Sequence, residues 1–313
     1  MLSPTDKSTQ ETVLAIDWWT DSLFCLTISR PALYHFVPGQ FSRLGLLAVP
    51  VPVSAPVTDP DTVLVPSSAV LWRAYSITSA TQDKHLEYYG IVVPGGAFTS
   101  AVRQLEPGAP ILLEKAPNGF LTAERFTRGE DLWMLATGTG LGPYIALLRD
   151  AAIWRRFKRL VLVHGVRHAP ELAYRSQLHE LAALAANQPA MARMHIVQAT
   201  TRDAAAAVRI AAPAELATVD GSASESGSHT KFTGGVGKDP DFGWPRLQGR
   251  ITTLLASGEL EAAVDLKITP DASRIMLCGN PAMIDETRRL LQQRALSPVR
   301  RAIPGHFLTE NYW

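Results

Sequence analysis

The sequence predicts an α/β protein of two domains, an N-terminal antiparallel β-barrel followed by a doubly wound parallel-sheet domain. Its 313 residues are enough for two separate hydrophobic cores. Before about residue 127, candidate strands are separated by Gly and Pro at short intervals, as in a barrel. Beyond that point short apolar runs alternate with helical patterns, which favours parallel strands joined by right-handed crossovers. We therefore expect domains at 10–127 and 128–313.

The expected barrel strands are short and are bounded by turn-forming residues: 22–28, 39–46, 86–93 and 109–114. The segment 49–69 is rich in Pro, Val and Ser, and we expect it to connect strands without forming part of the core.

The expected strands of the second domain are wholly or mainly apolar, which suits strands buried on both faces: 132–137, 160–163, 194–199 and 274–278. The helices expected between and after them are 141–157, 171–185 and 282–294. Segment 204–248 is rich in Ala, Ser and Gly and offers little apolar surface to bury. We expect it to be a flexible insertion.

Composition narrows the classes of function. The formal net charge of +1 gives no basic excess, so we expect no nucleic-acid partner. No apolar run approaches the roughly 18 residues of a membrane span, and we expect no stable membrane association. The polar N-terminus predicts no secretory signal. Cys25 and Cys278 are expected to be free thiols in a reducing cytoplasm, and two cysteines are too few for an iron–sulfur cluster.

The first motif is Arg73-Ala74-Tyr75-Ser76. On a strand, Arg73 and Tyr75 share one face and Ser76 takes the other. The motif offers a cation, an aromatic ring and a hydroxyl, the group types that a bound flavin needs for its pyrophosphate, its ring face and its ring edge. Taken alone, such a motif more often simply covers the end of a barrel.

The second motif is Gly138-Thr139-Gly140-Leu141-Gly142-Pro143, which follows a buried strand and opens a helix. Glycines there let the backbone approach a pyrophosphate at a helix N-terminus. The motif differs from the dinucleotide-binding fingerprint because its third Gly comes early and is followed by Pro, so by itself it is weak evidence.

Charges at the strand ends favour NADP over NAD. The second strand of this domain ends near Arg167 with no acid at its tip, and the third ends at Arg202. Carboxyl ends of parallel strands face one crevice, where two guanidinium groups would suit a 2′-phosphate better than a 2′-hydroxyl. Arg175 is a weaker candidate. Each of these arginines taken singly also fits a solvated surface residue.

These motifs, together with Cys278-Gly279-Asn280-Pro281, resemble those of the bacterial ferredoxin (or flavodoxin)–NADP+ reductase family. The resemblance covers about 12–203 and 247–313. It implies FAD on the barrel and NADP(H) on the parallel sheet. The implied FAD contacts are Arg73, Ala74, Tyr75, Ser76, Tyr89, Gly90, Ile91, Val92, Ala97, Phe98, Thr99, Thr139, Tyr312 and Trp313. The implied NADP contacts are Gly138, Gly140, Gly142, Val166, Arg167, Arg202, Arg250, Gly279 and Asn280.

The resemblance also implies roles. Tyr75 would stack on the flavin ring, with Ser76 beside its N5. Cys278 would position the nicotinamide without acting as a nucleophile, and Glu310 would serve a proton relay. Tyr312 and Trp313 would stack on the FAD. No metal site is expected, since no carboxylate joins the two histidines of 164–168.

The implied enzyme transfers hydride between NADPH and FAD and single electrons between FAD and a ferredoxin or flavodoxin. We expect a monomer that meets this acidic carrier transiently, steered by a set of cationic residues: Arg43, Arg73, Arg103, Arg300 and Arg301. Two alternatives remain, an NAD(P)H-dependent free-flavin or quinone reductase of the same architecture and a non-catalytic flavin-binding sensor.

Overall fold

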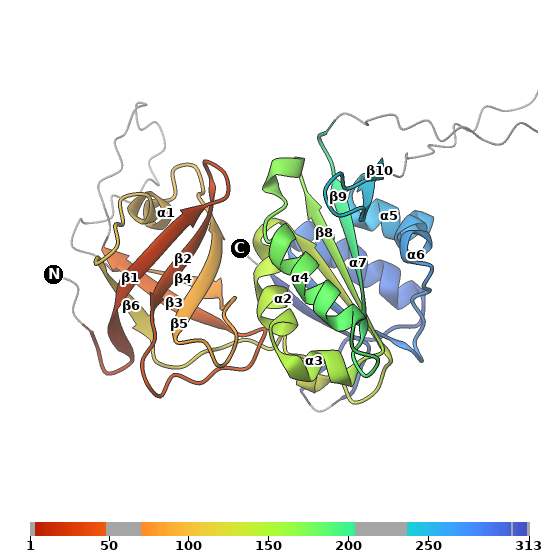
Figure 1. Cartoon of the computed structure of the whole chain (residues 1–313). Helices are drawn as coiled ribbons and strands as arrows, with labels where there is room; N and C mark the ends of the chain where they lie inside the picture. Colours follow the sequence, from red (N-terminus) through yellow and green to blue (C-terminus); the bar gives the residue numbers. More distant parts are fainter. Residues whose placement is uncertain (1–3, 48–69, 204–236, 302, 312–313) are drawn as a thin grey trace, which may run out of the picture.

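The computed structural model describes residues 4–47, 70–203, 237–301 and 303–311. A β-barrel and an α/β domain lie side by side, and the barrel is formed by the N-terminal part of the chain (Figure 1). The expected connection 49–69 and the stretch 204–236 of the expected insertion lie outside the described residues.

The barrel consists of six antiparallel strands in the order β4-β3-β6-β1-β2-β5. The two edge strands of this order, β4 and β5, approach each other at the bridge between Ile77, which follows β4, and Tyr88 of β5, and this contact brings the sheet toward closure. This confirms the predicted barrel. The strands are β1 (Ser8–Trp18), β2 (Leu23–Ser29), β3 (Phe41–Leu47), β4 (Val70–Ser76), β5 (His85–Ile91) and β6 (Pro110–Glu114), with helix α1 (Ala97–Val102) between β5 and β6.

Strand β1 was not predicted. Only two of its 11 residues, Ser8 and Val13, are buried, and burial does not alternate along the strand, so it lacks the regular pattern of a half-buried strand. It is held instead by its two neighbours, β2 and β6, which supply backbone partners on both sides. A strand of this kind follows from the tertiary arrangement and not from its side chains.

The second domain has a seven-stranded sheet in the order β10-β11-β9-β8-β7-β12-β13, parallel throughout except for β10. Its strands are β7 (Asp131–Thr137), β8 (Arg159–Val166), β9 (Arg193–Thr200), β10 (Gly237–Lys238), β11 (Pro245–Gln248), β12 (Ser273–Gly279) and β13 (Phe307–Asn311). The α-helices are α2 (Gly142–Leu148), α3 (Ala151–Arg156), α4 (Arg175–Ala186), α5 (Ile251–Ser257), α6 (Glu259–Val264) and α7 (Pro281–Gln293).

The helices cover both faces of this sheet. Alternate residues of β7 contribute to two different cores: Met134 packs with residues of α2 to α4, and Leu135 packs with residues of α5 to α7. Figure 1 shows the two helix layers on either side of the strands. The doubly wound prediction is therefore confirmed, and the chain reverses its direction of winding between β7 and β12.

The helix expected at 141–157 is two helices. It breaks at Arg149, and the next helix begins because the Asp150 carboxylate accepts a hydrogen bond from the Ala152 N–H at 3.0 Å. The helix expected from residue 171 begins at Arg175, after a 3-10 turn (Ala169–Glu171) and Tyr174, whose φ of 59° is left-handed.

The expected insertion is ordered at its C-terminal end, which was not predicted. Residues 237–248 contain β10 and β11, and β11 extends the sheet beside β9. Asp239 is buried there and forms ion pairs with Arg175 and Arg246. Phe242 and Trp244 stack on each other and Leu247 is buried, so apolar contacts as well as ion pairs hold this end of the segment.

Candidate functional site

Two clefts meet where the domains face each other. The larger, about 520 Å³, lies at the carboxyl ends of β7, β8 and β12 and is called here the sheet cleft. The smaller, about 370 Å³, lies along β4, β5 and the start of α1 and is called the barrel cleft. Both are of the size of small-molecule sites. Ile91 and Thr139 line both clefts, so the two form one continuous depression.

The barrel cleft contains most of the predicted flavin contacts. Its lining residues are Arg73, Ala74, Tyr75, Tyr89, Gly90, Ile91, Val93, Gly96, Phe98, Thr99 and Thr139. Val93 was not predicted, and Gly96 opens the predicted segment that continues with Ala97, Phe98 and Thr99. Ser76, Val92 and Ala97, which were predicted, do not line the cleft in this structure.

Tyr75 lies between two further aromatic rings, Phe98 at 5.6 Å and Phe24 at 6.2 Å between centroids. Gly90 makes this packing possible, because a Cβ at that position would collide with the rings of both Phe24 and Tyr75. The Tyr75 ring is thus fixed by its neighbours at one wall of the cleft, as a stacking platform requires.

Two buried hydroxyls in this region, those of Ser76 and Tyr89, make no hydrogen bond within the part of the chain that the structure describes. An unsatisfied buried hydroxyl is unfavourable and calls for a partner. Tyr89 lines the cleft, so a flavin with polar atoms on its ring edge would satisfy its hydroxyl, and together with the Tyr75 ring the residues present fit FAD. Arg73 is exposed, and its guanidinium donates to the Trp72 carbonyl. The Thr99 hydroxyl is used by its own loop, where it accepts from the Val93 N–H at 3.1 Å.

The sheet cleft lies at the point where winding reverses, the usual ligand position in such sheets. The glycines of the loop after β7 have different functions. Gly138 has a φ of 55° and open space where a side chain would lie. Gly140 instead packs against the Cys278 carbonyl, with which a Cβ would collide. Gly142 begins α2 and is buried without lining the cleft.

His164 fixes this loop from beneath. Its Nε2 lies 3.0 Å from the Gly138 carbonyl oxygen, and the ring is almost completely buried. Burial lowers the pKa of His164 to about 4, so the ring is neutral at physiological pH. The contact therefore requires the tautomer that carries its proton on Nε2 and donates it to the carbonyl.

The predicted phosphate-binding arginines are placed differently from one another. Arg167 and Arg250 line the sheet cleft, with Val166. Arg202 does not line it, although its N–H donates to the Arg167 carbonyl at 2.9 Å. Arg175, the weaker candidate, is turned toward Asp239 and Asp241 and does not line the cleft. The cleft also holds Glu171, which sequence reasoning missed.

The comparisons with known proteins agree with this geometry. Residues 134–212 match the family model described as oxidoreductase NAD-binding domain. The chain is 32% identical to ferredoxin–NADP reductase A of Sorangium cellulosum, over 96% of this chain and 89% of that protein. It is also 32% identical to the flavodoxin/ferredoxin–NADP reductase of Escherichia coli strain K12, over 96% and 97%. The chain belongs to the ferredoxin/flavodoxin–NADP reductase family.

A solved structure of a family member has the same architecture. It is the ferredoxin NADP+ reductase of Neisseria gonorrhoeae with bound FAD and NADP, with a TM-score of 0.75 and 30% identity. The match covers 99% of this chain and 100% of that one. The agreement therefore extends over both domains and is not confined to the NAD-binding segment.

In the present chain, Cys278 lies at the end of β12 and is fully buried behind the loop of Gly140. Burial raises the pKa of the thiol well above its usual value, so it remains protonated. Gly279 and Asn280 line the sheet cleft, whereas Cys278 does not. The Asn280 side chain accepts from the Ala282 N–H at 2.8 Å and caps α7.

Glu310 lies on β13 opposite Cys278 in the strand register. Burial raises the pKa of its carboxyl to about 7, although a hydrogen bond from the Phe120 backbone opposes the shift. A buried carboxyl that titrates near neutrality is suited to proton transfer. The predicted stacking residues Tyr312 and Trp313 lie outside the described residues.

Other classes of site find no support in the described parts of the chain. Residues 4–47, 70–203, 237–301 and 303–311 contain no group of three or more His, Cys, Asp or Glu side chains able to hold a metal ion. Within the same ranges, every helix is too short or too polar to cross a bilayer. The two cysteines are free and buried.

Proposed function

We propose that this chain is an FAD-dependent ferredoxin/flavodoxin–NADP+ reductase, which transfers hydride between NADPH and FAD and exchanges single electrons with a ferredoxin or flavodoxin. The observation that carries the proposal is the continuity of the two clefts through Ile91 and Thr139. A flavin on the barrel and a nicotinamide on the sheet would approach each other there. The curated relatives bear the name of this activity, and the Neisseria structure holds both cofactors.

The barrel residues would hold FAD through complementary contacts. The Tyr75 ring offers a flat surface, and Ser76 offers a buried hydroxyl without a partner. Arg73 is exposed at the rim of the cleft and offers a cation for the pyrophosphate. When bound, FAD supplies the conversion between two-electron and one-electron transfer.

The sheet residues would orient NADPH. The open side of Gly138 admits the pyrophosphate close to the backbone, and Arg167 and Arg250 provide positive charge for the 2′-phosphate. Asn280 and Gly279 would limit where the nicotinamide can lie. Cys278, neutral and buried behind them, would support this wall.

Glu310 is the candidate proton carrier, because its carboxyl changes charge near physiological pH. It lies next to Cys278 in the strand register and lines neither cleft in this structure. In this proposal it would hold or release a proton as the charge in the cleft changes.

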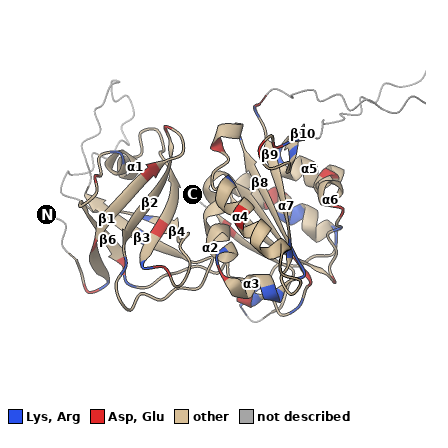
Figure 2. Ribbon diagram, viewed as in Figure 1, with Lys and Arg blue, Asp and Glu red and all other residues tan. Residues whose placement is uncertain are grey.

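The electron partner would be a small acidic carrier that binds transiently to a monomer in the cytoplasm. Lys and Arg are interspersed with Asp and Glu over both domains (Figure 2). Arg43, Arg73, Arg103, Arg300 and Arg301 are exposed or partly exposed cations that could steer such a carrier. Steering of this kind predicts turnover that slows as the ionic strength rises.

The decisive experiment is a visible spectrum of the purified protein, titrated anaerobically with NADPH and then with NADH. We expect a yellow protein that NADPH bleaches at a lower concentration than NADH. Reduction of cytochrome c should then depend on added ferredoxin or flavodoxin. A colourless protein would contradict both flavin functions, and carrier-independent turnover with a free flavin or quinone would favour the alternative reductase.

A further inference from the structure

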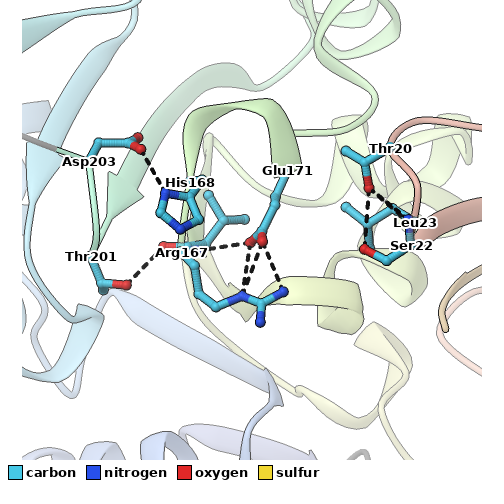
Figure 3. Close-up of polar contacts among 9 residues, drawn as sticks. Thr20, Ser22, Leu23, Arg167, His168, Glu171, Thr201 and Asp203 are labelled. Atoms are coloured by element: carbon cyan, nitrogen blue, oxygen red, sulfur yellow. Dashed lines mark hydrogen bonds and ion pairs between the residues drawn. The ribbon is translucent and has the colours of Figure 1, made fainter. Parts of the chain in front are cut away.

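The Glu171 side chain lies close to Arg167 at the tip of β8, although Glu171 is four residues further along the chain than Arg167. After Arg167 the backbone forms the 3-10 turn Ala169–Glu171, which directs the Glu171 carboxylate back toward Arg167 (Figure 3). Both side chains line the sheet cleft, together with Thr201 and Arg250. The carboxylate that sequence reasoning found absent from this strand end is therefore supplied by the following turn.

The Glu171 carboxylate binds Arg167 at two places. One oxygen accepts the Arg167 backbone N–H at 3.0 Å, and the other accepts the side-chain Nε–H at 3.1 Å. The latter oxygen also lies 2.9 Å from Nη2. Nη1 makes no hydrogen bond or ion pair with any residue that the structure describes, and Figure 3 shows the third guanidinium nitrogen pointing away from Glu171.

The turn that carries Glu171 is itself anchored. Asp203, just beyond β9, accepts the Ala169 N–H at 2.8 Å and lies 3.1 Å from Nδ1 of His168 (Figure 3). Glu171 is also the more buried partner, with 17% of its side chain exposed against 50% for Arg167. A fixed carboxylate thus holds a side chain that would otherwise move freely.

We propose that Glu171 is a positioning residue that favours binding of the 2′-phosphate of NADPH. It holds Arg167 along one edge of the guanidinium and leaves the other edge free for the phosphate. This inference rests on the proposed function. An unrestrained arginine loses side-chain freedom when it binds a phosphate. Glu171 restricts the Arg167 side chain before the cofactor binds, so less conformational entropy is lost on binding. Its negative charge opposes the phosphate, but it is already paired with Arg167.

The test compares binding of two probes by calorimetry. Adenosine 2′,5′-bisphosphate carries the 2′-phosphate, and adenosine 5′-monophosphate lacks it. We expect E171Q and E171A to raise the Kd for the bisphosphate by about tenfold and the Kd for the monophosphate by less than about twofold. R167Q should produce a similar selective loss. Adding E171Q to R167Q should have no further effect, because Glu171 acts only through Arg167.

Glu286 provides the matched control. It lines the same cleft on α7 and is exposed, and no ion pair between it and Arg167 is present in the described structure. E286Q removes the same charge without releasing Arg167, so the Kd for the bisphosphate should not rise. In steady-state kinetics, E171Q should raise KM for NADPH and leave kcat nearly unchanged.

Three results would overturn the inference. They are equal weakening of both probes by E171Q, tighter binding of the bisphosphate by E171Q, and additive losses in the double variant. In each case the parent protein would still prefer the bisphosphate and still be reduced by NADPH. If the parent shows neither property, the proposed function fails, and this inference fails with it.

Discussion

The Glu87 carboxylate of the barrel accepts a hydrogen bond from the Arg149 guanidinium of the α/β domain at 3.1 Å. The same oxygen accepts the hydroxyls of Tyr174 at 3.0 Å and Thr78 at 2.9 Å. Arg149 also donates to the Thr78 carbonyl at 2.8 Å. Three side chains from the two domains therefore converge on one carboxylate oxygen of Glu87, which limits how the two clefts can move relative to each other.

Substitution of Arg149 by Ala should loosen the domains. The pair is mostly buried, with 18% and 24% of the two side chains exposed, so its loss should lower the free energy of unfolding by about 1–3 kcal/mol. Flavin reduction at saturating NADPH should also slow, since the approach of the cofactors depends on domain position. Denaturant unfolding and stopped-flow absorbance would measure both effects.

The Arg288–Asp285 pair on α7 is the control for that variant. Its side chains are 44% and 57% exposed, and R288A should change stability by less than about 1 kcal/mol without slowing reduction. Equal effects of R149A and R288A would contradict a special function for the contact between domains.

Substitution of Ser76 by Ala should slow flavin reduction without lowering the stability of the flavin-free protein. The Ser76 hydroxyl is buried without a partner in the described structure, so its removal should leave the stability of flavin-free protein unchanged or slightly higher. With flavin bound, the rate of reduction by NADPH should fall by about 10- to 100-fold. Ser42 is the matched control, because its hydroxyl lies 2.7 Å from that of Tyr34. S42A should destabilise the protein by about 1 kcal/mol with or without flavin.

Glu310 should make stability depend on pH in a defined direction. Its pKa is about 7 in the folded protein, above the usual value of 4.5, so ionisation is unfavourable in the folded state. The protein should therefore lose stability as the pH rises from about 4.5 through about 7. E310Q should match the parent at pH 5 and exceed it at pH 8 by on the order of 1–3 kcal/mol. Chemical denaturation at the two pH values would measure the difference, and the same difference at both would exclude this titration.

His164 should make the stability of the protein depend on pH below about 6.5. Its pKa falls from 6.5 to about 4 on folding, so below pH 6.5 the unfolded chain binds the additional proton. Stability should be fully present above about pH 6.5 and decline as the pH falls toward 4. His195 and His306 have pKa values lowered in the same direction, so H164Q should reduce this slope without abolishing it. An unchanged slope in H164Q would show that the ring is not buried in neutral form.

Local sequence patterns were sufficient to predict the two-domain fold and the inner strands of the parallel sheet. Strands β7, β8 and β12 are apolar on both faces because helices cover both, and such runs are visible in any sequence. The same reasoning failed for β1, whose residues are mostly exposed or half-buried. It also failed for β10 and β11, which are tied to the domain partly through the Asp239 ion pairs.

The chemical groups of the site follow from local sequence, because the strand-end motifs carry an arginine, a tyrosine, a serine and glycines at fixed spacing. Which of these groups meet is set by the tertiary structure. It brought Ile91 and Thr139, 48 positions apart, into both clefts, and turned Arg175 toward Asp239. It also returned Glu171 to Arg167. Residue types are set locally, whereas distances depend on how turns, strand order and ion pairs fold the chain back on itself.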